Sequence, residues 1–230
     1  MLKITPFQMA VFEQDQEQRF RKQVREEIQQ SYAEYAGISS IILDHLLDLA
    51  LQRARSYGLT WQSTLGQFVY LMAAIAPNFD LHPAIHAGLV NPGVPVEERI
   101  NELVKNLPDG VWTEATSRAS TLGWFLTEDA FNVKPATRIA MALSNALPQN
   151  LATTLSDLES KVLPAMERAK AIGFDTEDGQ FVFSAGVIIY GIGFETRYDW
   201  TKDALDPELS PDLRAALLRT RIAIDTAAWL

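Results

Sequence analysis

The chain resembles itself at a constant spacing of 115 residues, which is half of its length of 230. Ala50 to Leu59 aligns without gaps on Ala165 to Phe174, and the same spacing places Phe68 on Phe183 and Phe79-Asp80 on Phe194-Glu195. Self-similarity at a fixed period is the mark of a repeated structural unit. The match therefore predicts an internal duplication, with an N-terminal helical half at 1–115 and a C-terminal half at 116–230.

The sequence pattern of both halves predicts helices. Apolar residues recur every three or four positions through most of the chain, and no Asn-Gly or Asp-Gly turn joins two alternating apolar runs, so the pattern favours helices over hairpins. The segment Phe181 to Tyr190 has a composition that suits a buried strand. It aligns with the helical segment Phe68 to Ala76, however, and we expect a helix there too. The predicted fold is all-α, with two related halves packed as a helical bundle.

Three segments carry specific expectations. We expect helix within Trp112 to Asn132, and a helix from Leu151 that Pro164 kinks or divides. The last helix begins at Ser210-Pro211. Its predicted inward residues are Leu213, Leu217, Ile224 and Ala228.

The repeat also predicts a pair of salt bridges. Arg53 and Arg168 recur in the last turn of one helix, and Asp80 and Glu195 recur just beyond the next helix. An arginine–carboxylate bridge in each half would hold two antiparallel helices in register. We favour this structural role over a substrate site, because the four charges are not clustered in the sequence.

Composition excludes several classes of function. Twenty Lys and Arg against 29 Asp and Glu give a net charge of −9, which is the wrong sign for binding nucleic acid or anionic lipid. The absence of cysteine excludes disulfides and thiolate metal sites. The longest apolar run, Phe181 to Phe194, is too short to cross a bilayer. With no apolar stretch near Met1 that resembles a signal peptide, we expect a cytoplasmic protein without membrane association.

Residues for catalysis or cofactor binding are hard to find. His82 and His86 stand four apart, but Pro83 lies between them and no third ligand is placed for a metal. We predict no metal, no cofactor and no enzymatic activity. Large side chains in segments of weak helical pattern are candidates for partner contacts, although burial in the core is the more common fate of tryptophan. These candidates are Trp112, Trp124 and Trp200.

The first 83 residues resemble small helical proteins encoded among type VI secretion genes of Gram-negative bacteria, beside genes for spike proteins, PAAR tips and effector adaptors. The matching features are the Ile4-Thr5 to Phe12 opening with Gln8-Met9, Arg53-Ala54-x-x-Tyr57-Gly58, Leu71-Met72 in an apolar helix, and Phe79-Asp80-Leu-His-Pro83. The resemblance implies a cytoplasmic co-chaperone that binds a secreted effector, its adaptor or both, and that assists effector loading.

Two alternatives stay open. An immunity protein that neutralises a cognate toxin would share the acidic charge, and a helical enzyme would place a site between the halves, around Asp80, His82, His86 and Glu195. The long first helix, with its narrow apolar stripe, also permits a homodimer.

Overall fold

The computed structural model describes residues 6–126, 130, 132–148, 151 and 154–226. Every regular element in these ranges is helical, and none is a strand, as the periodicity predicted. The α-helices are α1 Pro6–Ser31, α2 Ser40–Ser56, α3 Gln62–Ala74, α4 Pro83–Leu89, α5 Arg99–Asn106, α6 Asp109–Ser117, α7 Pro135–Ala146, α8 Leu155–Ala171, α9 Glu177–Tyr190, α10 Phe194–Arg197, α11 Trp200–Ala204 and α12 Pro211–Thr226. Short 3-10 helices are η1 Ala33–Tyr35, η2 Phe79–Leu81, η3 Val96–Glu98 and η4 Thr121–Trp124.

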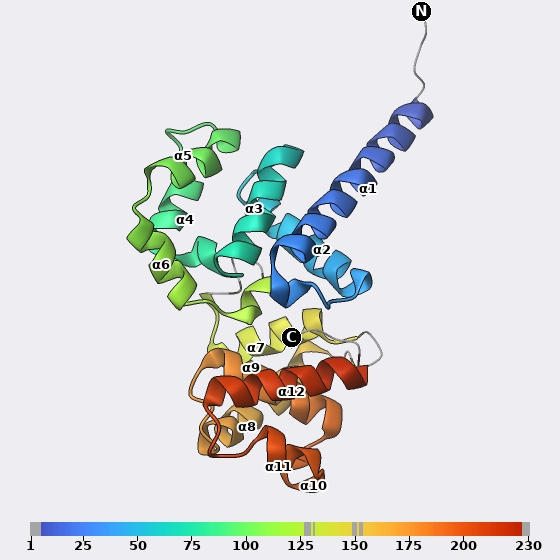
Figure 1. Cartoon of the computed structure of the whole chain (residues 1–230), viewed down its shortest axis with the longest axis vertical. Coiled ribbons are helices and arrows are strands. Elements are labelled where there is room, and N and C mark those ends of the chain that lie inside the picture. The colour runs from blue at the N-terminus through green and yellow to red at the C-terminus, as the bar shows by residue number, and fades with distance from the viewer. Residues whose placement is uncertain (1–5, 127–129, 131, 149–150, 152–153, 227–230) are drawn as a thin grey trace, which may run out of the picture.

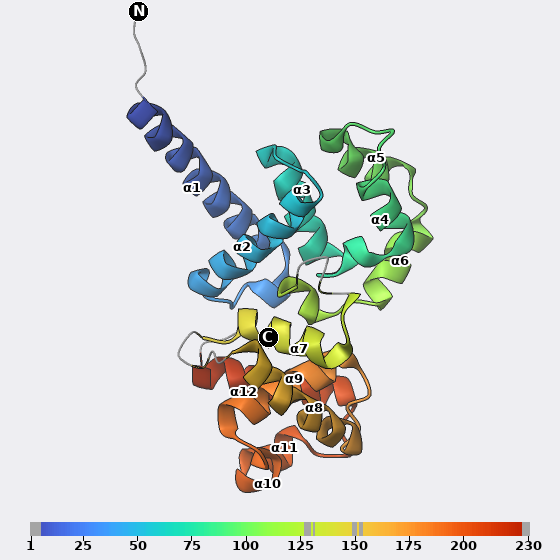
Figure 2. The same ribbon diagram turned by 180° about the vertical axis from the view of Figure 1, so that it is seen from behind.

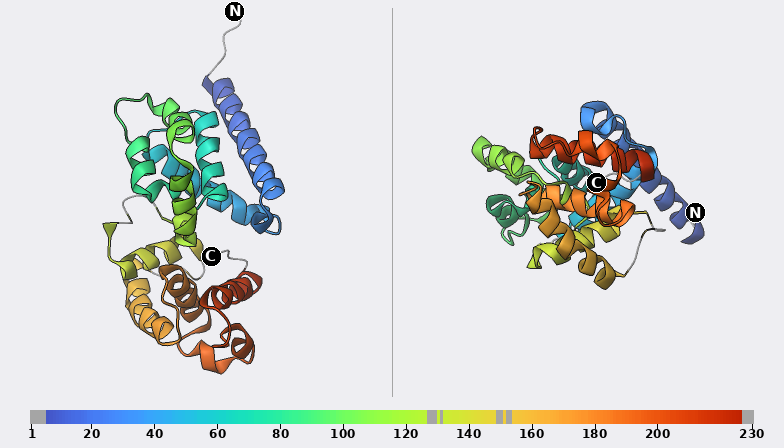
Figure 3. Two further views of the ribbon diagram at one scale, coloured as in Figure 1. Left: turned by 60° about the vertical axis from the view of Figure 1, so that its left-hand side comes forward. Right: turned by 90° about the horizontal axis from the view of Figure 1, so that it is seen from below.

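The helices form two lobes stacked along the long axis of the molecule (Figures 1 and 2). The N-terminal lobe holds α1 to α6, and the C-terminal lobe holds α7 to α12. The first turns of α1 extend beyond the rest of the N-terminal lobe, away from the C-terminal lobe (Figure 3). The predicted division after residue 115 falls within α6, which packs against η2 of the N-terminal lobe.

The two lobes repeat the same local design at the spacing of 115 residues. Helix α2 and helix α8 begin and end 115 residues apart, and α3 and α9 begin 115 residues apart. Ser39 and Thr154 cap the first helix of each pair by accepting a hydrogen bond from a backbone N–H three residues on. Gly58 and Gly173 end it with φ angles of +83° and +87°. Duplication as the origin of this match stays a prediction, tested by superposition of the lobes.

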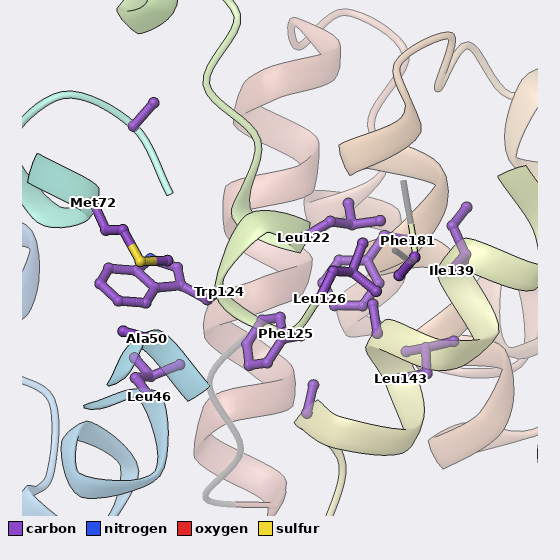
Figure 4. Packing of buried hydrophobic residues seen from close by; sticks show 14 of the residues in the cluster. Leu46, Ala50, Met72, Leu122, Trp124, Phe125, Leu126, Ile139, Leu143 and Phe181 are labelled. Atoms are coloured by element: carbon purple, nitrogen blue, oxygen red, sulfur yellow. The ribbon is translucent and has the colours of Figure 1, made fainter. Parts of the chain in front are cut away.

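The short segment Trp124-Phe125 connects the cores of the lobes. Trp124 in η4 is 2% exposed and lies against Leu46, Ala50 and Met72 of the N-terminal lobe (Figure 4). The next residue, Phe125, points the other way, and its ring centroid lies 5.8 Å from that of Phe181 in α9. Neighbouring apolar side chains therefore enter the cores of two different lobes.

The helical structure expected within Trp112 to Asn132 comprises the end of α6, which stops at Ser117, and η4. Two other expectations about this architecture need correction. The helix expected from Leu151 begins at Leu155, and Pro164 does not divide it, since α8 runs on to Ala171.

The second correction concerns α12, which buries a different face from the predicted one. Leu213, Leu217 and Ile224 are exposed, and Ala228 lies outside the described residues. The buried side chains are Arg214, Ala215, Leu218 and Ile222.

Candidate protein-binding groove

Arg53 and Asp80, predicted to pair, form a buried ion pair in the N-terminal lobe. Arg53 Nε and Nη2 donate to the two carboxylate oxygens of Asp80 at 2.7 and 2.6 Å, and the side chains are 1% and 0% exposed. The Tyr57 hydroxyl donates to the same carboxylate at 2.8 Å. Arg53 Nη1 also donates to the carbonyl of Gly123 at 2.8 Å. The guanidinium thus ties α2 to η2 and to the segment that joins the lobes, which is a structural task.

Arg168 and Glu195 pair in the C-terminal lobe, but in a different environment. Arg168 Nη2 contacts Glu195 Oε1, and the arginine side chain is 43% exposed. This bridge links α8 to α10 at the far end of the lobe (Figure 1). The two bridges match in position along the chain and differ in their access to water.

The residues of the hypothetical site between the halves are not brought together. Asp80 and Glu195 lie in different lobes, each bonded to the arginine of its own lobe. His82 Nε2 lies 3.3 Å from the Glu114 carboxylate, and the ring of His86 lies 6.0 Å from that of Tyr57. Within the described residues, no group of three His, Asp or Glu side chains is arranged to hold a metal ion.

The tryptophan candidates divide between core and surface. Trp124 is not a partner contact, because its ring is part of the core. Trp200 is half-buried among Tyr190, Phe194 and Tyr198, and Trp112 is half-buried in α6. The most exposed described tryptophan is Trp61, at the N-cap of α3, which the sequence analysis did not single out.

An open, largely apolar groove lies on α3 in the N-terminal lobe. It lies between α3 and α5 and has a volume of about 410 Å³. Its apolar lining comes from Leu71 and Ala74 on α3 and from Ile100 and Val104 on α5. Val104 is 56% exposed. Lys105, at the rim, is the one charged side chain among the described lining residues.

Tyr70 separates this groove from a second one. The second groove lies between α3 and α1, has a volume of about 280 Å³ and is lined partly by Phe20 and Val24. The Tyr70 hydroxyl donates a hydrogen bond to the Glu27 carboxylate on α1. Burial and this bond raise the pKa of Tyr70, and the same bond lowers the pKa of Glu27. Helix α3 thus stands between α1 and α5 with a hollow on each side (Figure 1).

The packing of α5 explains why the α3 groove is open. Helix α5 packs mainly against α4 and only lightly against α3. A Cβ at Gly88 of α4 would lie 2.2 Å from Cδ2 of Leu103, so the glycine permits α5 to approach α4 closely. Because α5 packs against α4, it leaves one flank of α3 uncovered.

Sequence reasoning missed this groove, although a signal was present. Leu71 belongs to an apolar helix in the sequence, yet it lines the groove and is only half-buried. Helix α3 carries apolar side chains on more of its circumference than one core contact requires.

No described helix of either lobe meets the length and hydropathy needed to span a membrane. No family model matches the chain, and neither does any curated protein or solved structure.

Proposed function

We propose that this chain is a non-catalytic, protein-binding accessory that docks its partner in the α3 groove. The observation that carries the proposal is an open apolar hollow of about 410 Å³ with a polar rim on an acidic protein. Exposed apolar hollows rimmed by polar groups are typical of protein and ligand contacts. The charged residues singled out in the sequence are occupied with holding helices together.

Within this role, the chain acts as a cytoplasmic co-chaperone that assists an adaptor in stabilising and loading a type VI secretion effector. The resemblance of the first 83 residues supports this finer assignment. The net charge of −9 is compatible with it, since acidic surfaces deter wrong partners by repulsion.

The test compares two arginine substitutions in tagged protein expressed in its native host. Ala74→Arg places a long charged side chain in the groove, and Ile41→Arg makes the same change at an 81% exposed residue of α2 outside it. We expect wild-type protein and Ile41→Arg to co-purify an effector or adaptor and Ala74→Arg to lose it. Equal recovery by all three proteins would rule out the groove as the docking site.

Co-expression with the partner then separates the co-chaperone from an immunity protein. A co-chaperone raises the abundance or loading of the effector, whereas an immunity protein rescues cells from the toxin. Rescue without any change in effector abundance would contradict the co-chaperone role.

A further inference from the structure

The C-terminal lobe covers the flank of α9 that corresponds to the groove on α3. Helix α12 lies along α9. Arg219 donates to Asp178 at 2.8 Å near the start of α9, and Tyr190 donates to Asp225 at 2.9 Å at its end. Helix α12 therefore lies along α9 and is bonded to it near both ends (Figure 1).

The same flank of α3 lacks such a cover. At the spacing of 115 residues, Tyr70 and Ala74 correspond to Ala185 and Ile189 of α9. Ala185 is 0% exposed and Ile189 is half-buried, whereas Tyr70 is half-buried and Ala74 is exposed. Helix α5 lines this flank without closing over it, and Asn101 near its start accepts a hydrogen bond from Gln67 at 3.1 Å. Helix α5 is also shorter, with 8 residues against the 16 residues of α12.

We propose that the α3 groove takes an amphipathic helix of another protein, which lies along α3 as α12 lies along α9. This inference rests on the function proposed above and adds the chemistry of the partner. The partner helix inserts between α3 and α5 and covers Leu71 and Ala74 with its apolar face.

The inward face of α12 indicates which side chains such a helix presents. Its buried apolar residues, Ala215, Leu218 and Ile222, follow each other at spacings of three and four. That spacing keeps side chains on one side of a helix. A helix as long as α12, which has 16 residues, extends about 24 Å at 1.5 Å per residue, which is enough to follow the 13 residues of α3 over their whole length.

Lys105 determines which charge the partner helix should carry beside α5. It lies at the groove rim on α5, and no described side chain forms an ion pair with it. A carboxylate on the flank of the partner helix facing α5 complements this charge. A second copy of this chain is an alternative outcome, and the test below distinguishes it from a helix of another protein.

The test uses designed peptides and the full-length chain. Each peptide has the length of α12 and repeats the Ala215, Leu218 and Ile222 spacing on one face, with either Glu or Lys on one flank. Binding of fluorescein-labelled peptide is measured by anisotropy at an ionic strength of about 0.15 M, where the Debye length of about 8 Å suppresses the effect of net charge. We expect the Glu peptide to bind about threefold more tightly than the Lys peptide, and Lys105→Glu to reverse this order.

Substitutions in the groove and in the peptide complete the test. We expect Ala74→Arg to weaken binding of the Glu peptide by roughly tenfold or more, and Ile41→Arg to leave it unchanged. A proline in the middle of the peptide should abolish binding, because it breaks the helix. Three results would each overturn the inference: no binding of the Glu peptide up to about 1 mM, equal binding of the proline peptide, or equal binding to Ala74→Arg.

The host co-purification test and the peptide test can give different outcomes, which distinguish failure of the proposed function from failure of this inference. Loss of the partner from Ala74→Arg without binding of any helical peptide would retain the proposed function and reject a helix as the occupant. A self-association that Ala74→Arg abolishes would instead identify a second copy as the occupant and overturn the inference.

Discussion

At the scale of residues, the two arginine–carboxylate bridges show how one sequence motif acquires two energetic roles. The Arg53–Asp80 pair is sealed from water, and Asp80 accepts three hydrogen bonds from Arg53 and Tyr57. The Arg168–Glu195 pair has a guanidinium that is 43% exposed. The spacing of the charges was predictable from the repeat. Their difference in burial was not, because it depends on Gly123, which the sequence does not place beside Arg53.

The first prediction compares the two carboxylates. Asp80→Asn leaves the buried Arg53 without its counter-ion, so we expect the free energy of unfolding to fall by about 3–5 kcal/mol. Glu195→Gln weakens a bridge that water screens, and we expect a loss of at most about 1 kcal/mol. Urea denaturation of both variants measures the difference. Similar losses would show that the burial of the Arg53–Asp80 pair has no energetic consequence.

The second prediction concerns the wall between the two grooves. The hydrogen bond from Tyr70 lowers the pKa of Glu27 below its usual value in the unfolded chain. The folded state is therefore favoured by this bond above the unfolded pKa of about 4.3, and the contribution is lost as pH falls through the lower folded pKa. NMR titration of Glu27 should give a pKa that Tyr70→Phe raises. An identical pKa in wild type and variant would mean that the bond does not form.

At the scale of elements, helix existence was predictable and helix orientation was not. The start of α12 at Pro211 follows from Ser210-Pro211 in the sequence, and α9 forms despite its strand-like composition. Helix α12, however, has apolar residues on two faces, and periodicity does not tell which one turns inward. The structure buries the face that contains Arg214, whose guanidinium donates to the carbonyl of Ile172 and lies 5.1 Å from the ring centroid of Phe174. A buried arginine made that face look polar in the sequence.

The third prediction tests this orientation with neighbouring leucines. Leu218 is 0% exposed, so Leu218→Ala should lower the free energy of unfolding by about 2–5 kcal/mol. Leu217 is 39% exposed, and Leu217→Ala should cost less than about 1 kcal/mol. Thermal and urea denaturation provide both values. A larger loss for Leu217→Ala than for Leu218→Ala would show that α12 buries the face predicted from the sequence.

At the scale of the whole molecule, η4 and Phe125 contact the cores of both lobes. Trp124 packs in the core of the N-terminal lobe, and Phe125 contacts Phe181 of the C-terminal lobe. Arg53 donates a hydrogen bond to the carbonyl of Gly123. The repeat predicted two similar halves but said nothing of their junction, because η4 lies outside the matched segments. The candidate groove also escaped prediction, since it arises from the tilt of α5 towards α4 and not from any motif.

The fourth prediction addresses this junction. Trp124→Ala removes the ring from the N-terminal core, and we expect a loss of about 3–5 kcal/mol in the free energy of unfolding. The loss should fall on the N-terminal lobe, so that the variant unfolds in two steps. Hydrogen exchange resolved by residue measures each lobe. Uniform weakening of both lobes would contradict a separate N-terminal core.

The central claim, that a helix of a partner protein lies in the α3 groove, is tested most directly by photo-crosslinking in the native host. A benzophenone amino acid replaces Val104 in the groove wall, and Leu163, 57% exposed on α8, serves as the control position. We predict that Val104 crosslinks to one partner segment, at residues spaced three and four apart, and that Leu163 does not. Crosslinks from Val104 to consecutive residues of an extended segment, or the same products from both positions, would contradict the account.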